Sequence, residues 1–282
     1  MIEMKSVSKT FGKKKVLDNL YLTIDKGVYG LLGPNGIGKT TLIRSILGLY
    51  DIDDGEIIID GKIMDSKKKN TGMIGYLPQQ FGMFKELTTA EVLEYFSILK
   101  GICASDLKKE IVRCLSVVNL QHDRKTLVGA LSGGMLRRLG IAQALLGDPK
   151  LLIFDEPTAG LDPEERMRFK DIIASISKDR TVIISTHIVQ DVDVICNHIL
   201  IMKSGTNIIQ GTKEEIRSFA REKVYRILCG DQDKISGKRY IENIEEDGGT
   251  NYYKVLCSDR QKIGTVLSPT VEDGYMSIIK EV

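Results

Sequence analysis

Short apolar and β-branched runs alternate with longer stretches of helical periodicity from residue 1 to about residue 220. Some of these runs are continuously apolar, which is typical of strands buried on both faces of a parallel sheet. Earlier runs, at 2–7, 21–24 and 56–59, alternate apolar and polar residues more, as half-exposed antiparallel strands do. The order of strands and helices predicts an α/β core with a largely parallel sheet. Buried strands are expected at residues 28–32, 73–77, 151–154, 181–185 and 199–202.

Between about residues 88 and 147 the pattern becomes purely helical. Apolar side chains recur three or four positions apart from residue 92 to 99, and again from 107 to 118. This periodicity predicts a helical subdomain, residues 80–147, inserted between two strands of the core. Most of its apolar stripes are expected to pack inward.

The chain changes character after residue 222. Strands are predicted at 224–228 and 252–257, separated by a polar stretch that contains glycine. Ser258 or Asp259 is expected to cap a short helix that reaches about residue 267. We therefore expect a main body and a small accessory C-terminal domain of α+β type.

The boundary between these two parts is expected at residues 220 and 221, which gives domains 1–220 and 221–282. A tail of roughly 60 residues is near the size at which a separate hydrophobic core becomes marginal. It is therefore expected to pack against the main body or a partner.

Composition narrows the class of protein. The 282 residues correspond to about two domains, and 42% hydrophobic and 28% charged residues are typical of a soluble globular chain. Forty basic and 38 acidic residues leave a net charge of +2, which favours neither nucleic acid nor anionic lipid as a partner. No apolar run approaches the ~18–20 residues that a membrane span needs, and the N-terminus lacks the apolar region of a secretory signal.

The cysteines and the lysine runs add two minor expectations. The five cysteines never form a C-x-x-C pair, which favours a reducing cytosol over a disulfide framework. The lysines at 13–15 and 67–69 are expected in solvated loops.

A glycine-rich segment carries the first chemical signal. Residues 33–40, GPNGIGKT, match G-x-x-x-x-G-K-[S/T], with an apolar strand before them and an amphipathic helix after them. Glycines let successive N–H groups turn inward at a helix N-terminus, which favours bound phosphate over an empty turn. Lys39 adds a charge for the β- and γ-phosphates, and the Thr40 hydroxyl can bind Mg²⁺. The predicted nucleotide contacts are Gly33, Pro34, Asn35, Gly36, Ile37, Gly38, Lys39, Thr40 and Thr41.

Two carboxylates follow the apolar run at 151–154. Asp155 and Glu156 would lie at the carboxyl end of a buried strand, where ligands bind in open α/β sheets. Buried carboxylates need a cation or hydrogen bonds, so two solvated acids at the start of a loop are the weaker interpretation. We expect Asp155 to hold Mg²⁺ and Glu156 to orient and deprotonate the attacking water.

Two further strand ends carry polar side chains. His187 follows the strand at 181–185. Taken alone, the structural interpretation of this histidine is favoured, but in parallel register with the strand of Asp155 it could reach the γ-phosphate. Gln79 follows the strand at 73–77, and its amide could contact Mg²⁺ or the water and report occupancy to the helical segment. Taken singly, Gln79 would be an ordinary loop residue.

Together these residues resemble the nucleotide-binding subunit of an ATP-binding cassette (ABC) transporter over roughly residues 1–220. The segment LSGGM at 131–135 resembles the family's LSGGQ signature, with Met135 in place of Gln. Asp162, in AGLD, matches the D-loop, His187 the switch histidine and Gln79 the Q-loop. Phe11 matches the aromatic residue that stacks on adenine.

The resemblance implies a P-loop NTPase core with a mixed parallel sheet, an antiparallel β subdomain and an inserted helical signature subdomain. It implies that two cassettes dimerise head to tail, so that Ser132, Gly133 and Gly134 meet the ATP bound at the other chain's P-loop. It also implies a cytoplasmic Mg²⁺-dependent ATPase, peripheral on the inner face of the membrane, with Glu156, His187 and Lys39 as catalytic residues. The expected partners are permease subunits and a second cassette, identical or different, and no nucleic acid. ATP is favoured over GTP because the chain has no N-K-x-D sequence.

Signatures that end in Met are similar to those of export-type cassettes with a separate permease, and the late segment PTVED resembles a pattern near the end of such subunits. The alternative is a soluble ABC-type switch acting on ribosomes or DNA. A single P-loop, the lack of long heptad arms and a near-neutral charge argue against it. The presence of Glu156 and His187 argues against a binding module without hydrolysis.

Overall fold

The computed structural model describes residues 1–64, 73–205 and 207–282. The lysines at 67–69 lie outside these described residues. The chain divides into two compact units, Met1–Ile208 and Ile209–Val282. Compactness thus groups residues 209–220 with the second unit, whereas the sequence pattern groups them with the first.

The first unit begins with an antiparallel sheet. It contains β1 (Ile2–Phe11), β2 (Lys14–Ile24), β4 (Asp54–Ile59) and the short β5 (Lys62–Ile63), in the order β2-β1-β4-β5. Buried and exposed side chains largely alternate along β2, so one face of the sheet packs inward. The predicted half-exposed antiparallel strands are confirmed. Strands β1, β2 and β4 are each longer than the apolar runs that predicted them.

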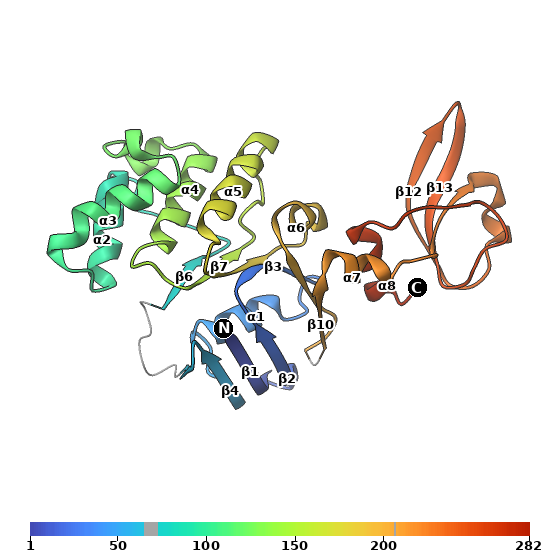
Figure 1. Cartoon of the computed structure of the whole chain (residues 1–282), viewed down its shortest axis with the longest axis horizontal. Coiled ribbons are helices and arrows are strands. Elements are labelled where there is room, and N and C mark those ends of the chain that lie inside the picture. The colour runs from blue at the N-terminus through green and yellow to red at the C-terminus, as the bar shows by residue number, and fades with distance from the viewer. Residues whose placement is uncertain (65–72, 206) are drawn as a thin grey trace. The chain divides into compact units, whose positions relative to one another are not determined.

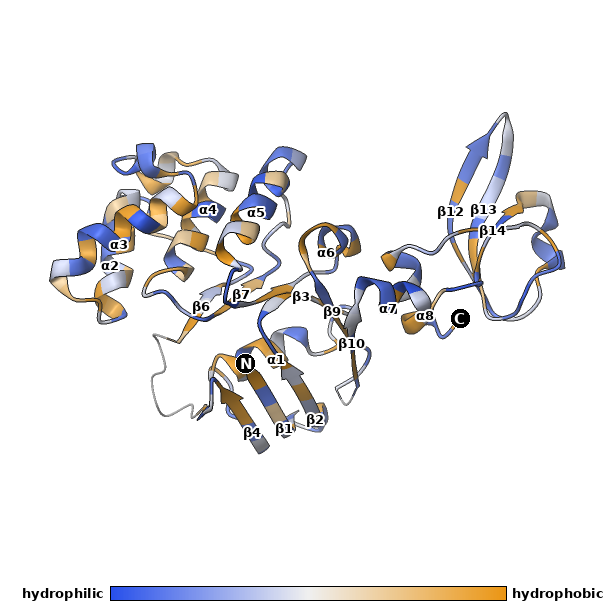
Figure 2. Ribbon diagram, in the orientation of Figure 1, coloured by the Kyte–Doolittle hydropathy of each residue, from blue (hydrophilic) through white to orange (hydrophobic). Residues whose placement is uncertain are grey.

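A parallel sheet forms the centre of the unit. Its strands β3 (Gly27–Leu32), β6 (Ile74–Leu77), β7 (Leu151–Asp155), β8 (Thr181–Ser185) and β9 (His198–Met202) run in the order β9-β3-β8-β7-β6. These match the predicted buried strands to within a residue at each end. All five residues of β7 are buried, and Figure 2 shows this strand as hydrophobic. The next strand, β10 (Ile208–Thr212), contains the boundary between the two units.

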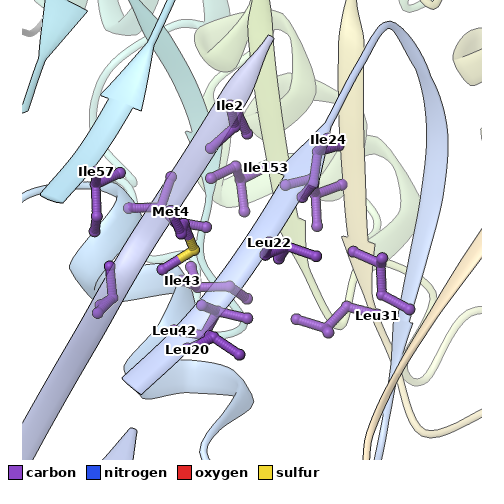
Figure 3. Packing of buried hydrophobic residues seen from close by; sticks show 14 of the residues in the cluster. Ile2, Met4, Leu20, Leu22, Ile24, Leu31, Leu42, Ile43, Ile57 and Ile153 are labelled. Atoms are coloured by element: carbon purple, nitrogen blue, oxygen red, sulfur yellow. The ribbon is translucent and has the colours of Figure 1, made fainter. Parts of the chain in front are cut away.

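Helix α1 (Lys39–Ile46) and both sheets share one hydrophobic core. Figure 3 shows Met4 of β1, Leu22 of β2, Ile43 of α1 and Ile153 of β7 gathered in this cluster. Each such side chain contributes about 1.5–3 kcal/mol when fully buried. This packing anchors α1, and therefore the loop that precedes it, against the body of the unit.

The region between β6 and β7 is helical, as the periodicity predicts. It contains α2 (Thr89–Leu99), α3 (Ala104–Val117) and α4 (Gly133–Ala144), with 3₁₀ turns at Gln121–Asp123 and Val128–Ala130. Figure 1 shows these helices together beside β6. Two more helices, α5 (Pro163–Ile176) and α6 (Val189–Ile195), follow β7 and β8. Among the described residues, no helix has the length and apolar character that would let it cross a membrane.

The second unit combines an antiparallel sheet with two helices. The strands β11 (Val224–Leu228), β12 (Arg239–Asp247), β13 (Thr250–Cys257) and β14 (Thr265–Val266) have the order β12-β13-β11-β14. The helices are α7 (Lys213–Ser218) and α8 (Val271–Lys280), and a 3₁₀ segment spans Cys229–Lys234. Both strands predicted for this region are confirmed, and β12 lies within the stretch that we expected only to separate them.

The short helix expected after Ser258 or Asp259 is wrong. The Ser258 hydroxyl accepts from the Lys238 N–H (2.9 Å) instead of capping a helix. Gly264 has φ +80° and passes so close to the Arg226 carbonyl that a Cβ would lie 2.5 Å from it. The chain then pairs with β11 as β14, because the edge of that sheet satisfies its backbone better than an isolated helical turn would.

Candidate functional site

The glycine-rich loop joins β3 to α1. A Cβ on Gly33 would lie 2.7 Å from the Met202 carbonyl oxygen, and Gly38 has φ +122°, so larger residues would distort the loop. Gly38 is also the N-cap of α1 and supplies no side-chain cap to the helix. The first N–H groups of α1 are therefore available to an anion at the positive end of the helix.

Lys39 folds back onto this loop. Its Nζ donates to the carbonyl oxygens of Gly33 (2.5 Å) and Pro34 (3.2 Å). Burial lowers the pKa of Lys39, while the nearby charges of Glu156 and Asp155 oppose that shift. The carbonyls of Gly33 and Pro34 thus hold the ammonium group of Lys39 against the phosphate loop.

The loop and three strand ends line one pocket of about 240 Å³. The pocket brings together the phosphate loop, Gln79 shortly after β6, the two carboxylates at the end of β7 and Ser185 at the end of β8. Parallel strands place their carboxyl ends at one edge of the sheet, which explains this convergence. The lining residues are Val16, Asn35, Gly36, Gly38, Lys39, Thr40, Thr41, Gln79, Asp155, Glu156 and Ser185.

Asp155 is buried, with 6% of its surface exposed. Burial raises the pKa of its carboxyl, the charge of Glu156 adds to this, and Lys39 opposes it. No group of three or more His, Cys, Asp or Glu side chains within 1–64, 73–205 and 207–282 is arranged to hold a metal. However, a hydroxyl (Thr40), an amide (Gln79) and this carboxylate line the same pocket. Mg²⁺ prefers such oxygen donors and usually completes its shell with phosphate and water, so the residues fit this ion.

Glu156 and His187 are in direct contact. The Nδ1 atom of His187 lies 3.0 Å from both carboxylate oxygens of Glu156. Because an ionised carboxylate only accepts hydrogen bonds, this geometry fits an Nδ1–H donor. Glu156 itself has φ +50°, a left-handed conformation that is strained for a residue with a side chain. Its N–H donates to the Ser185 carbonyl (2.8 Å), which holds the turn.

The signature residues line a different pocket, of about 470 Å³. Ser132 caps α4, and its hydroxyl accepts from the Met135 N–H (3.2 Å). A Cβ on Gly133 would meet nothing within 4 Å, whereas one on Gly134 would lie 2.5 Å from the Glu165 side chain. The lining residues are Gln79, Phe81, Ser132, Gly133, Gly134, Leu136, Arg137, Ala159, Gly160, Leu161, Asp162 and Glu165.

Gln79 therefore lines both pockets. Gly33, Pro34 and His187 line neither, and the other predicted residues, apart from Phe11 and Ile37, line one of the two. Asp162 lies in the signature pocket, where its Oδ1 accepts from the Glu165 N–H (2.8 Å) and caps α5. Phe11 lines neither pocket. The residue is 43% exposed, and its ring meets that of Tyr50 edge-on with a centroid distance of 5.3 Å. Ile37 also lines neither and packs its side chain toward Gly33.

Sequence reasoning missed several residues that line the two pockets, among them Ser185, Val16 and Arg137. Ser185 pairs in register with Asp155 across β7 and β8, so the order of parallel strands would have pointed to it. Val16 lines the phosphate pocket, and Arg137 lines the signature pocket. No local motif in the sequence distinguishes either of these two residues.

The ABC transporter family model matches residues 17–159 of the chain. The chain belongs to this family. Nod factor export ATP-binding protein I of Rhizobium sp. (strain N33) is 33% identical over 260 residues, which cover 88% of this chain and 84% of that protein. This membership makes the chain an ATP-binding subunit that hydrolyses ATP.

Solved cassettes share the fold. CbiO1 from Clostridium perfringens, described as part of the ABC transporter complex cbiONQ, superimposes with a TM-score of 0.71 at 26% identity, over 77% of this chain and 90% of that one. A dimeric ATP-binding cassette in a post-hydrolysis state, bound to ADP and Pi, superimposes with a TM-score of 0.66 at 26% identity. That match covers 75% of this chain and 98% of the other.

Proposed function

We propose that the chain hydrolyses Mg²⁺-ATP at a site shared with a second cassette and that this cycle energises export through a separate permease. One observation carries the proposal. The phosphate loop and the signature of a single chain line two different pockets. Each pocket then provides half of a nucleotide site, and a second copy or a related chain completes it.

In the phosphate half-site, the loop from Gly33 to Thr41 binds the phosphates. Lys39 contributes its charge after it leaves the carbonyls that it now contacts. Thr40, Gln79 and Asp155 would hold Mg²⁺, which would supply positive charge to offset the negative charge that develops on the phosphates. Phe11, exposed beside Tyr50, is available to stack on adenine.

Glu156 is the proposed general base. Glu156 is buried, with 7% of its surface exposed. Because it lines the phosphate pocket, the attacking water would reach its carboxylate from there. His187 holds both of its oxygens at 3.0 Å, which fixes the direction of the carboxylate. The imidazole is 57% exposed and can turn to the γ-phosphate when nucleotide fills the pocket.

The signature half-site closes over the nucleotide of the other chain. Ser132 lies at the N-terminus of α4, and Gly133 has free space where a side chain would be. Both features suit a phosphate, because the helix end supplies N–H donors and positive potential. Binding of ATP would then join two cassettes, and hydrolysis would separate them.

Export and membrane association rest on relatives of the chain. A relative at 33% identity carries Nod factor export in its name, and the exposed Gln79 region offers a surface for permease subunits. The cassette would then act at the inner face of the membrane. The accessory region, 221–282, would brace the dimer or dock on the permease, while residues 1–220 form the ATPase domain.

The substitution Glu156→Gln tests the proposed base. An amide cannot accept the proton of the attacking water, so turnover should fall at least about 100-fold while Mg²⁺-ATP still binds. The variant should then accumulate as an ATP-bound dimer, measured by light scattering after size exclusion together with release of phosphate.

Glu164→Gln is the matched control, because Glu164 is exposed on α5, where it pairs with Arg168. This variant should behave like the unmodified chain in both measurements. Wild-type turnover by Glu156→Gln would remove Glu156 from the mechanism.

A further inference from the structure

Arg137 connects the signature helix to the ends of two strands. Its side chain extends from α4, five residues after Ser132. One terminal nitrogen donates to the carbonyl oxygens of Pro78 (3.4 Å) and Gln79 (3.2 Å), and the other donates to that of Glu156 (3.0 Å). A single guanidinium thus holds the backbone after β6 and the backbone after β7.

This set of partners is unusual for an arginine close to two carboxylates. Within the described residues, Arg137 donates only to backbone carbonyls. Burial lowers the pKa of Arg137, opposed by the charges of Asp155 and Glu156, so the guanidinium sits in the same electrostatic environment as the site. Its fork of donors can serve several carbonyls at once, which a lysine cannot do.

The neighbouring Arg138 contacts a different part of the chain. Its guanidinium donates to the carbonyls of Val118 and Asn119, both at 3.1 Å, in the helical region itself. These two bonds fasten α4 inside its own subdomain, and the Nε atom of Arg138 also pairs with Glu165 of α5 (3.4 Å). Arg137 instead fastens α4 to Gln79 and Glu156, on the other side of the boundary between helices and sheet.

The bond to Glu156 acts on a strained residue. Glu156 has φ +50°, which turns its carbonyl toward Arg137 while its N–H bonds to the Ser185 carbonyl. Strained backbone conformations persist only where neighbouring groups hold them. Loss of the guanidinium would free the carbonyl side of this turn and allow the carboxylate to move.

We propose that Arg137 is a positioning residue that couples the signature of a chain to the hydrolytic centre of the same chain. Helix α4 presents Ser132 to the ATP held by the partner cassette. Any shift of α4 on closure pulls, through Arg137, on the backbone of Gln79 and of Glu156. Each cassette would thus set its own base in response to the nucleotide of the other. This inference rests on the proposed shared site.

The test compares Arg137→Gln, Arg137→Lys and the control Arg138→Gln in the full chain. For Arg137→Gln we expect kcat for Mg²⁺-ATP to fall about tenfold or more with KM within about twofold, because Arg137 holds the base and does not line the phosphate pocket. Arg137→Lys should recover part of kcat, because one donor replaces several. A similar kcat in Arg137→Gln and the unmodified chain would overturn the proposal.

Hydrogen exchange supplies a measurement that does not depend on turnover. In nucleotide-free Arg137→Gln, amides in 77–82 and 155–160 should exchange faster, whereas Arg138→Gln should accelerate exchange around residues 115–120. If both variants accelerate the same segments, Arg137 is only structural and the coupling is wrong. If the unmodified chain hydrolyses no ATP, the proposed function fails, and the exchange pattern still decides whether Arg137 holds both strand ends.

Discussion

At the scale of single residues, one lysine of the second unit forms ion pairs with two carboxylates. Lys254 pairs with Glu242 (2.7 Å) and with Asp273. Asp273 also accepts from the N–H of Thr270 (2.6 Å) as part of the capping box of α8, so hydrogen bonds hold its pKa below the usual range. Burial, together with Asp273, raises the pKa of Glu242 to about 7.

This raised pKa predicts a pH dependence of stability. Folded Glu242 binds a proton up to about pH 7, whereas an unfolded glutamate releases it near pH 4.3. The folded state therefore holds more protons between these values, and the free energy of unfolding should decrease as pH rises through this window. Glu242→Gln mimics the protonated form and should remove this contribution, so its stability relative to the unmodified chain should increase from pH 5 to pH 7.5.

Urea unfolding of the full chain at the two pH values measures this difference. Glu246→Gln, at an exposed position of the same strand, is the control and should show no such change. A difference between Glu242→Gln and the unmodified chain that stays constant with pH would contradict the assignment.

At the scale of elements, the PTVED segment that resembles a pattern of export-type subunits has a structural role. Thr270 and Asp273 form the capping box of α8. Gly274 follows at a point where α8 meets the backbone of α7, because a Cβ there would lie 2.0 Å from the Ile216 carbonyl oxygen. The segment therefore starts α8 and lets it pack closely on α7.

Gly274→Ala should separate these helices. The added methyl group cannot fit against a backbone carbonyl without a shift, so we expect a loss of about 1–3 kcal/mol in the free energy of unfolding. Differential scanning calorimetry measures the change. Gly230→Ala provides the control, because a Cβ at Gly230 would meet nothing within 4 Å. The stability of this variant should stay nearly the same as that of the unmodified chain. Equal stability of the two variants would rule out the close contact at Gly274.

At the scale of the whole molecule, the separation of the two half-sites predicts complementation. Lys39→Ala damages the phosphate half-site and leaves the signature intact, while Ser132→Arg blocks the signature and leaves the phosphate loop intact. A mixed dimer contains one complete site, formed by the loop of the second variant and the signature of the first.

Mixing the two inactive variants should therefore restore ATP hydrolysis above the sum of the separate rates, with the largest effect near equal amounts. Release of phosphate across a titration of one variant into the other measures it. A rate no greater than the sum would contradict a site shared between two copies of this chain.

The sequence alone determined the parts of the site that depend on short segments. The turn from Gly33 to Thr40 and the carboxylates after β7 are recognisable because their chemistry and their local structure are encoded together. The central strands were predictable for the same reason, since burial on both faces demands continuous apolar runs such as 151–154.

Only the tertiary structure decided the rest. Strand β12 was missed because most of its residues are polar and a bulge between Ile241 and Asn243 breaks its alternation. The helix expected after Ser258 was wrong because a distant strand offered its edge to residues 265 and 266. Likewise, Arg137 reaches carbonyls 58 and 19 residues away along the chain. Backbone carbonyls are present at every position, so a bond to them leaves no mark in the sequence, and only the folded chain reveals which of them an arginine holds.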